Sequence, residues 1–226
     1  MRLGIVGWHD GGAGQIHSWF EKNSNIQIIC FFSPDRSPLE FKKTSRHVQK
    51  FSYPENGQLK KLPLIIDENW WEYAKKLELD AVTIILENAR ERFRQIEIAQ
   101  TKGIELFSVI HPSVVVSPDA VIGKSCVLFP QVFVGYRAEI GDGVIINTGS
   151  QVDHHCKLDR GVTLDPACVL AGNVRVEAFS HLHTSVTVIN KIVIGEGSRV
   201  GAGSLVIRNI KPNSLNYGVP SREREK

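Results

Sequence analysis

The sequence predicts two parts of different fold class. Residues 1–109 read as a small Rossmann-like parallel α/β domain, and residues 110–226 as a left-handed parallel β-helix of hexapeptide repeats with a C-terminal tail. Strands and helices alternate in the first part. In the second, an aliphatic side chain recurs every six residues from Ile110 to Val206 without a miss, and a small or β-branched side chain stands two residues before most of these.

A period of six matches neither a helix nor an alternating strand, but it suits short strands joined by tight corners. Three such faces make a coil of about eighteen residues, so the repeat predicts roughly five coils. Glycine or a short acid often follows the aliphatic residue, as at Gly135, Gly141 and Asp153. We expect these to be corner residues with unusual dihedrals or self-capping side chains. A sandwich or barrel of short strands, the alternative, would tolerate breaks in phase.

The first hundred residues carry the pattern of a parallel sheet covered by helices. Trp70 and Trp71 open one of the expected helices and are expected to pack against the sheet. The lysine-rich stretch 36–61 shows no clear period. The expected strands are 3–7, 26–32, 62–66, 81–86 and 105–109, and the expected helices are 15–21, 69–77 and 89–102.

A glycine-rich loop, Gly7-Trp8-His9-Asp10-Gly11-Gly12-Ala13-Gly14, connects the first strand to the first helix. Backbone amides at such a junction can hold a phosphate, and we assign that contact to Gly11, Gly12 and Gly14. Asp35, at the end of the second strand, could bind a ribose or a base edge. Together they predict a mononucleotide site. The glycine spacing does not fit the dinucleotide fingerprint, and a tight turn that needs glycine only for its geometry is the alternative.

Bulk properties exclude several classes of protein. The net charge of +3 is too small to indicate a nucleic-acid partner. No apolar run reaches the length of a membrane span and residues 1–20 lack the apolar core of a signal peptide, so we expect a cytoplasmic protein. Cys126, Cys156 and Cys168 fall at the small inward position of the repeat. They are expected to be reduced core thiols, since an inward thiol keeps a high pKa and cannot reach a substrate.

Asp153-His154-His155 is unusual for a corner of this repeat. Val152 and Cys156 are the inward residues on either side, so both histidines should be exposed. An exposed histidine with an adjacent acid that fixes its tautomer is a candidate general base. Solvated turn residues are the alternative that these residues leave open.

Three segments of the second part resemble the bacterial hexapeptide acyltransferases that acetylate sugars. Within that class the chain is most similar to the group with an N-terminal nucleotide-sugar-binding domain: the N-acetyltransferases of nucleotide-linked 4-amino sugars and the sialic acid O-acetyltransferase-like proteins. The resemblance covers nearly the whole chain, including Asp35 and the joint His111-Pro112-Ser113. The three segments are Asn147-Thr148-Gly149-Ser150-Gln151-Val152-Asp153-His154-His155-Cys156, Ala171-Gly172-Asn173-Val174 and Gly218-Val219-Pro220-Ser221-Arg222.

The resemblance implies acetyl-CoA-dependent N-acetylation of a nucleotide-linked amino sugar in bacterial glycan or lipopolysaccharide biosynthesis, with sugar O-acetylation as the alternative. It implies direct transfer, with His154 as the base and Asp153 as the acid that orients it; His155 stands where the family often has an acid. Acetyl-CoA would lie in a groove between two β-helices of a homotrimer. Its expected contacts are the backbone amides of Gly172, Thr184 and Ala202, and the side chain of Arg222 near its phosphates. The Gly172 amide would also stabilise the oxyanion.

Two rival functions remain at this point. The γ-type carbonic anhydrases use the same repeat and hold zinc with three histidines, two of them five residues apart, a spacing that no pair has here. His181 and His183 alternate on one outward strand face and could chelate a metal, but we expect no metal cofactor. The second rival is a non-enzymatic hexapeptide assembly module. Asp153-His154 together with Gly172-Asn173 argues against it, because assembly needs no base beside an amide groove.

Overall fold

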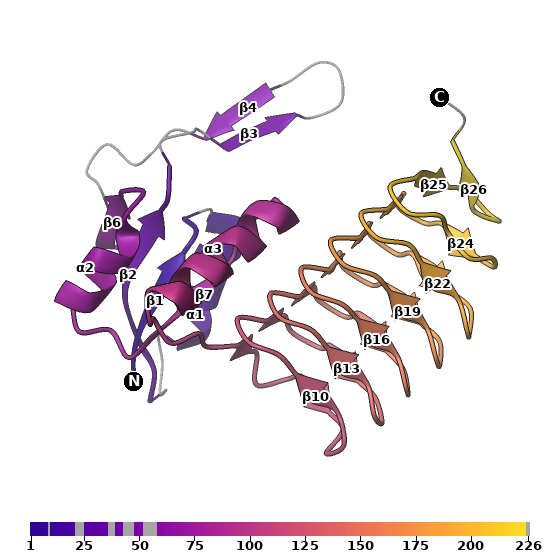
Figure 1. Ribbon diagram of the computed structural model, residues 1–226, viewed down its shortest axis with the longest axis horizontal. Coiled ribbons are helices and arrows are strands. Elements are labelled where there is room, and N and C mark those ends of the chain that lie inside the picture. The colour runs from indigo at the N-terminus through magenta and orange to yellow at the C-terminus, as the bar shows by residue number, and fades with distance from the viewer. Residues whose placement is uncertain (9, 21–24, 36–38, 43–47, 52–57, 225–226) are drawn as a thin grey trace. The chain divides into compact units, whose positions relative to one another are not determined.

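The computed structural model describes residues 1–8, 10–20, 25–35, 39–42, 48–51 and 58–224. Contacts between Cα atoms divide the chain into two compact units (Figure 1). Met1–Leu86 and Ile98–Leu106 form the N-terminal unit, and Glu87–Glu97 and Phe107–Lys226 form the second unit, which contains the solenoid. The first half of one helix is therefore grouped with the solenoid.

The N-terminal unit is built on one sheet with the strand order β5-β6-β2-β1-β7. Its four long strands are parallel, and β1 has β2 on one side and β7 on the other. This is the order of half a Rossmann fold, which confirms the predicted fold class. The strands are β1 (Arg2–Val6), β2 (Gln27–Ser33), β6 (Leu62–Ile66), β7 (Ala81–Ile84) and the antiparallel edge β5 (Gln58–Leu59).

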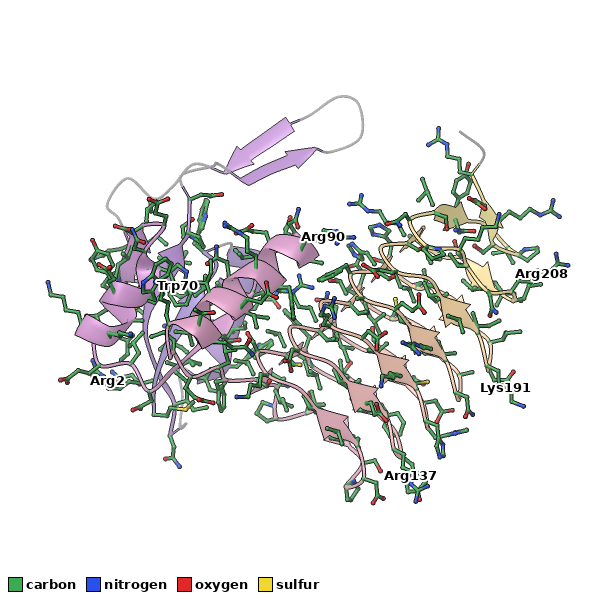
Figure 2. All side chains as sticks on the ribbon, viewed as in Figure 1. Arg2, Trp70, Arg90, Arg137, Lys191 and Arg208 are labelled. Carbon is green, nitrogen blue, oxygen red and sulfur yellow. The ribbon has the colours of Figure 1, made fainter. Side chains whose placement is uncertain are left out.

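Helices and buried aromatic rings cover this sheet. A π-helical turn, η1 (Asp10–Gly14), leads into α1 (Gln15–Phe20), and α2 (Trp70–Lys76) and α3 (Ala89–Thr101) follow later. Trp70 is fully buried, with its ring 5.6 Å from that of Phe32 and 6.1 Å from that of Trp71. The side chains in Figure 2 show Trp70 inside the N-terminal unit. Trp70 packs against the sheet as predicted, and the half-buried Trp71 packs against Trp70.

The structure adds strands where the sequence showed no pattern, and it lacks one strand that the sequence predicted. The stretch without a clear period contains an antiparallel hairpin, β3 (Leu39–Lys42) and β4 (Val48–Phe51), as well as β5. The strand expected over 105–109 does not form, because only Leu106 makes an isolated bridge, to Val82. Val109 already belongs to the first strand of the solenoid.

The second unit winds into the predicted left-handed parallel β-helix, whose two-residue strands lie in three parallel sheets. Residues eighteen apart pair in register: Val127 pairs with Ile145, Ile145 with Thr163, and Thr163 with His181. Sheet I contains β8 (Val109–Ile110), β11 (Val127–Leu128), β14 (Ile145–Ile146), β17 (Thr163–Leu164), β20 (His181–Leu182), β23 (Arg199–Val200), β25 (Leu215–Tyr217) and the antiparallel β26 (Arg222–Glu223). Sheet II contains β9 (Val115–Val116), β12 (Phe133–Val134), β15 (Gln151–Val152), β18 (Val169–Leu170), β21 (Thr187–Val188) and β24 (Leu205–Val206). Sheet III contains β10 (Val121–Ile122), β13 (Glu139–Ile140), β16 (Lys157–Leu158), β19 (Arg175–Val176) and β22 (Val193–Ile194).

The aliphatic series of the repeat fills the solenoid interior. Every member from Leu128 to Val206 is buried. Ile110 is 37% exposed, and Val116 and Ile122 are only half-buried, since the first coil has a neighbour on one side alone. The predicted inward face is therefore confirmed, and stacking of coils supplies the burial that two-residue strands cannot provide alone.

The small inward position has a second use that the sequence did not reveal. Its hydroxyl or thiol donates a hydrogen bond to a backbone carbonyl at the following corner. Ser150 Oγ bonds Asp165 O at 3.0 Å, Ser180 Oγ bonds Gly195 O at 2.8 Å, and Cys156 Sγ bonds Ala171 O at 3.1 Å. These hydrogen bonds satisfy the buried hydroxyl and thiol groups, which explains why serine and cysteine are accepted in an apolar core.

The glycines that directly follow the aliphatic residue are needed for a different reason from the one expected. The left-handed residue is the third after the aliphatic one, as at Gln131 and His155, both with φ near +60°. Gly135 and Gly141 are not left-handed. A Cβ at Gly141 would approach Arg160 N at 2.8 Å in the next coil, so close stacking of coils excludes a side chain there.

A buried arginine joins the first half of α3 to the solenoid within the second unit. Arg92 is fully buried; its Nε donates to Gly143 O at 2.8 Å, and its Nη2 donates to Gly161 O and Thr163 Oγ1, both at 2.9 Å. Burial lowers the pKa of Arg92 to about 10, so the side chain stays charged at neutral pH. Among the described residues, no helix is long and apolar enough to cross a membrane.

Candidate active site at the His154 corner

Asp153, His154 and His155 form the corner between β15 and β16, where sheet II passes into sheet III. His155 adopts the left-handed conformation, with φ of 58°, and its N–H donates to Tyr136 O at 2.8 Å. The carbonyl of His154 accepts from Asn173 N–H at 2.9 Å in the next coil. The corner is thus fixed on both sides by its neighbouring coils, and both imidazoles are exposed, as predicted.

The partner of the His154 ring is His155. The carboxylate of Asp153 accepts from the backbone N–H of His154 at 2.6 Å, so it holds the main chain of the corner. The Nδ1 atoms of His154 and His155 lie 3.1 Å apart, with the two rings nearly perpendicular. Such a contact requires one nitrogen to carry a proton and the other a lone pair. When His154 donates through Nδ1, its Nε2 is left unprotonated and able to accept a proton.

The other face of the His154 ring lies against Gly172, eighteen residues later in the same row of corners. A Cβ at Gly172 would overlap the Cε1 and Nε2 atoms of the ring. The Gly172 carbonyl accepts from Lys191 N–H at 3.1 Å, while its own N–H has no hydrogen-bond acceptor among the described residues. An exposed imidazole and an unused amide donor therefore lie side by side.

Positive side chains extend along this row of corners. Figure 2 shows Arg137, Lys191 and Arg208 along one edge of the solenoid. Hydrogen bonds between successive corners place His154 and His155 in the same row. All three basic side chains are exposed, so they can meet an anionic ligand that lies along this edge.

The other predicted acyl-donor positions lie at a different corner. Thr184 and Ala202 occupy adjacent coils where sheet I passes into sheet II, and Thr184 O accepts from Gly203 N–H at 2.9 Å. Arg222 is exposed in β26. Sheet II separates Thr184 and Ala202 from His154 and Gly172. Within one chain, Thr184 therefore lies near Ala202 and His154 lies near Gly172, but these two pairs are far from each other.

The predicted phosphate loop lies where the strand order of the N-terminal sheet reverses. Gly7 has a φ of 133°, and a Cβ there would lie 2.6 Å from Ile85 O, directly after β7. Gly11, Gly12 and Gly14 fall in η1, and a Cβ at Gly12 would lie 3.1 Å from Ile85 Cδ1. The crevice between such neighbouring strands is the usual ligand position of open α/β sheets. His9 of this loop lies outside the described residues.

Asp35 lines a shallow pocket at the carboxyl ends of β2 and β6. Asp67 and Glu68, which follow β6, contribute two more acids. Carboxylates repel phosphate but accept hydrogen bonds from ribose hydroxyls and from the N–H groups of a base. The pocket therefore suits the nucleoside part of a ligand better than its phosphates.

Cys156 follows the two histidines and could be mistaken for a nucleophile. It is buried, and burial raises the pKa of its thiol to about 11. At neutral pH the sulfur is protonated and engaged with Ala171 O. A thiolate mechanism at this residue is therefore disfavoured.

Comparisons with known proteins match this architecture over the full chain. A GDP-perosamine N-acetyltransferase from Caulobacter crescentus, solved with CoA and GDP-perosamine, is 26% identical with a TM-score of 0.84, covering 100% of this chain and 98% of that one. The acetyltransferase domain of PglB from Neisseria gonorrhoeae, solved with acetyl coenzyme A, is also 26% identical, with a TM-score of 0.78 and 99% and 98% coverage. The resemblance to sugar acyltransferases is confirmed. The Caulobacter enzyme supports N-acetylation over O-acetylation, both similarities support an enzyme over an assembly module, and neither indicates a metal cofactor.

Other comparisons cover less of the chain. No protein-family model matches it. A serine acetyltransferase from Bacillus subtilis is 27% identical over 103 residues, and one from Synechococcus elongatus is 33% identical over 96 residues. The chain spans less than half the length of these curated relatives, 46% and 37% respectively. The Caulobacter enzyme has also been solved as variants with one histidine replaced by alanine or asparagine.

Proposed function

We propose that the protein transfers the acetyl group of acetyl-CoA to the amine of a nucleotide-linked amino sugar, in the biosynthesis of a bacterial glycan such as lipopolysaccharide. The observation that carries the proposal is the contact between the His154 imidazole and Gly172, whose amide is unused. It occurs in a chain that matches a GDP-perosamine N-acetyltransferase from end to end. The proposal includes a cytoplasmic location, which four free and buried thiols support.

The proposed reaction is a direct transfer. The sugar amine attacks the thioester carbonyl, and its proton passes to Nε2 of His154. The carbonyl oxygen gains negative charge and accepts a hydrogen bond from the Gly172 N–H. The tetrahedral intermediate then collapses, the C–S bond breaks and the thiolate of CoA takes up a proton. His155 is the positioning residue in this scheme, because its Nδ1 accepts from Nδ1 of His154 while Nε2 receives the amine proton.

The acyl donor would occupy a groove between two subunits of a homotrimer. Thr184 and Ala202 lie on one side of sheet II, and His154 and Gly172 lie on the other. A neighbouring subunit that covers sheet II would bring the corner with Thr184 and Ala202 of one chain toward the corner with His154 and Gly172 of the next. Arg222 and the basic side chains of the His154 row would then meet the phosphates of the coenzyme.

The outward face of sheet II supports this trimer. Val115, Phe133 and Val169 stand in one row of this sheet, with Gln151 between the last two, and are 60%, 40% and 36% exposed. Exposed apolar side chains gathered in one row indicate a contact surface. We expect Phe133→Glu combined with Val169→Glu to dissociate the trimer, and light scattering after gel filtration measures this.

A matched control for this prediction is Val121→Glu. Val121 is 63% exposed but lies on sheet III, so a glutamate there should leave the trimer intact. A wild-type protein that is monomeric and active would contradict both the trimer and the groove between subunits.

The nucleotide would bind the N-terminal unit, with its phosphates at Gly11, Gly12 and Gly14 and its nucleoside near Asp35. We expect Asp35→Asn to weaken nucleotide-sugar binding about tenfold, the usual effect of losing a hydrogen bond to a charged group. Acetyl-CoA binding should stay unchanged, and isothermal titration calorimetry measures both affinities. Asp119→Asn, at a solenoid corner, is the matched control and should change neither. Wild-type protein that binds NADH in preference to nucleotide sugars would contradict the assignment.

The proposed function can be tested with a panel of amino sugars linked to UDP, GDP, CDP and TDP. A ligand that binds the native state raises the melting temperature by mass action, so one nucleotide series should stabilise the protein above the others. The stabilising sugar should then release free CoA from acetyl-CoA at a rate proportional to enzyme concentration. Stabilisation by none of them, with no CoA release from any, would reject the proposal.

A further inference from the structure

We propose that Asp165, His181 and His183 form a binding site for a divalent transition-metal ion, with Zn²⁺ the ion that best fits this set of ligands. The two histidines come from β20 and its immediate end, and Asp165 directly follows β17, the neighbouring strand of sheet I. All three residues belong to the second unit. The proposal does not rest on the acetyl transfer, since the ion would take no part in it.

Strand geometry aims both imidazoles outward on the same side. Leu182, between them, is fully buried in the solenoid core, and successive side chains of a strand point to opposite faces. Thr163 pairs with His181 and Leu164 with Leu182, so the next residues along the two strands, Asp165 and His183, are neighbours. A His-X-His pair on one strand and a carboxylate on the next therefore converge.

The distances between ligand atoms fit a tetrahedral ion. Asp165 Oδ1 lies 3.0 Å from His181 Nε2, and Asp165 Oδ2 lies 3.0 Å from His183 Nδ1. One ligand atom from each of the three residues lies within 4.8 Å of the others. Zinc bonds of about 2.0–2.2 Å in a tetrahedron place the ligand atoms about 3.3–3.6 Å apart, so both 3.0 Å contacts would lengthen by a few tenths of an ångström when an ion binds.

His181 holds a shielded nitrogen against the carboxylate of Asp165. Its Nε2 is shielded from solvent and lies 3.0 Å from Asp165 Oδ1, without the geometry of a well-directed hydrogen bond. A shielded polar atom that is poorly aligned with its neighbour loses part of the free energy of a hydrogen bond. A metal ion, bound by the lone pair of Nε2 and by the carboxylate, would offset that loss.

Two ion pairs with Asp165 are a weaker explanation for the cluster. Both histidines would then need to be protonated, but their ring centroids are only 4.1 Å apart and the rings are tilted by 34°. Two imidazolium ions stacked at this distance repel each other. Neutral imidazoles are the form that binds a metal, so a shared ion would use all three side chains without two adjacent imidazolium charges.

The experiment uses the full-length protein, stripped of metal with a chelator and then dialysed. Titration with Co²⁺ should give the visible absorption of a tetrahedral site, and competition with Zn²⁺ should yield one ion bound per chain. His183→Gln and Asp165→Asn, which nearly keep side-chain size, should each weaken Zn²⁺ binding about a hundredfold or more. Circular dichroism confirms that each variant is folded.

His155→Gln is the matched control, because His154 and His155 are the other adjacent pair of imidazoles among the described residues. It should leave Zn²⁺ affinity unchanged. The proposal is overturned if the stripped wild type binds no Zn²⁺ at micromolar concentration, if Asp165→Asn and His183→Gln bind as tightly as wild type, or if His155→Gln loses the ion. The experiment measures metal binding alone. If the protein binds no metal, the proposed acetyl transfer is unaffected, and if it transfers no acetyl group, the proposed metal site is unaffected.

Discussion

Replacement of His154 by alanine or asparagine is expected to lower kcat about a hundredfold or more, with little change in KM for either substrate. General base catalysis contributes roughly this factor. An interaction needed only in the transition state affects kcat rather than ground-state binding. The structural reason is that the ring is exposed and lies against Gly172. Steady-state kinetics with acetyl-CoA and the amino sugar identified by the binding panel measure the effect.

His155 provides the comparison within the same corner. His155→Ala removes the Nδ1 partner of the base but leaves Nε2 of His154 in place, so its loss of kcat should be smaller. Nearly wild-type rates for His154→Ala together with an inactive His155→Ala would show that the two roles are reversed. If both variants were active, the corner would have only a structural role.

Gly172→Ala is expected to lower kcat at least tenfold while it leaves the melting temperature nearly unchanged. A Cβ at this position would occupy the space of the His154 Cε1 and Nε2 atoms, so the ring must move away from the reacting amine. Displacement of a catalytic group by about 1 Å can cost a hundredfold in rate. Gly172 is not in the left-handed region, and the obstructing ring is at the exposed surface, so the fold should accept alanine.

Gly103→Ala should give the opposite pattern. Gly103 has a φ of 69° and open space around its Cα, so alanine strains the backbone but displaces no side chain. Its melting temperature should fall while kcat stays at the wild-type value. A Gly172→Ala variant that kept full activity would mean that the contact between His154 and Gly172 is not needed for the reaction.

The sequence predicted the solenoid well because its stability depends on a local and periodic feature. One buried aliphatic side chain in every hexad determines which face of each strand points inward, so Leu128 through Val206 could be placed without knowledge of tertiary contacts. Arg92 shows where this method stops. Its acceptors at Gly143, Gly161 and Thr163 are 51 to 71 residues away, and no local pattern connects a helix to corners at that separation.

The candidate site was predictable in position but not in detail. The exposure of His154 followed from the inward assignment of Val152 and Cys156. The partner of the His154 ring could not be predicted, because the choice between Asp153 and His155 depends on side-chain rotamers. The glycines after the aliphatic residues were assigned to the right corners for the wrong reason, because the distance between stacked coils is a property of the whole solenoid.

The most direct test of the central claim is the chemical identity of the product formed from acetyl-CoA and a nucleotide-linked amino sugar. Mass spectrometry and NMR of the purified nucleotide sugar locate the acetyl group. We predict a single acetyl group in amide linkage to the sugar nitrogen, formed by the wild type and at least about a hundredfold more slowly by His154→Ala. An acetyl ester on a hydroxyl group, or release of CoA with no acetyl group gained by the sugar, would contradict the account.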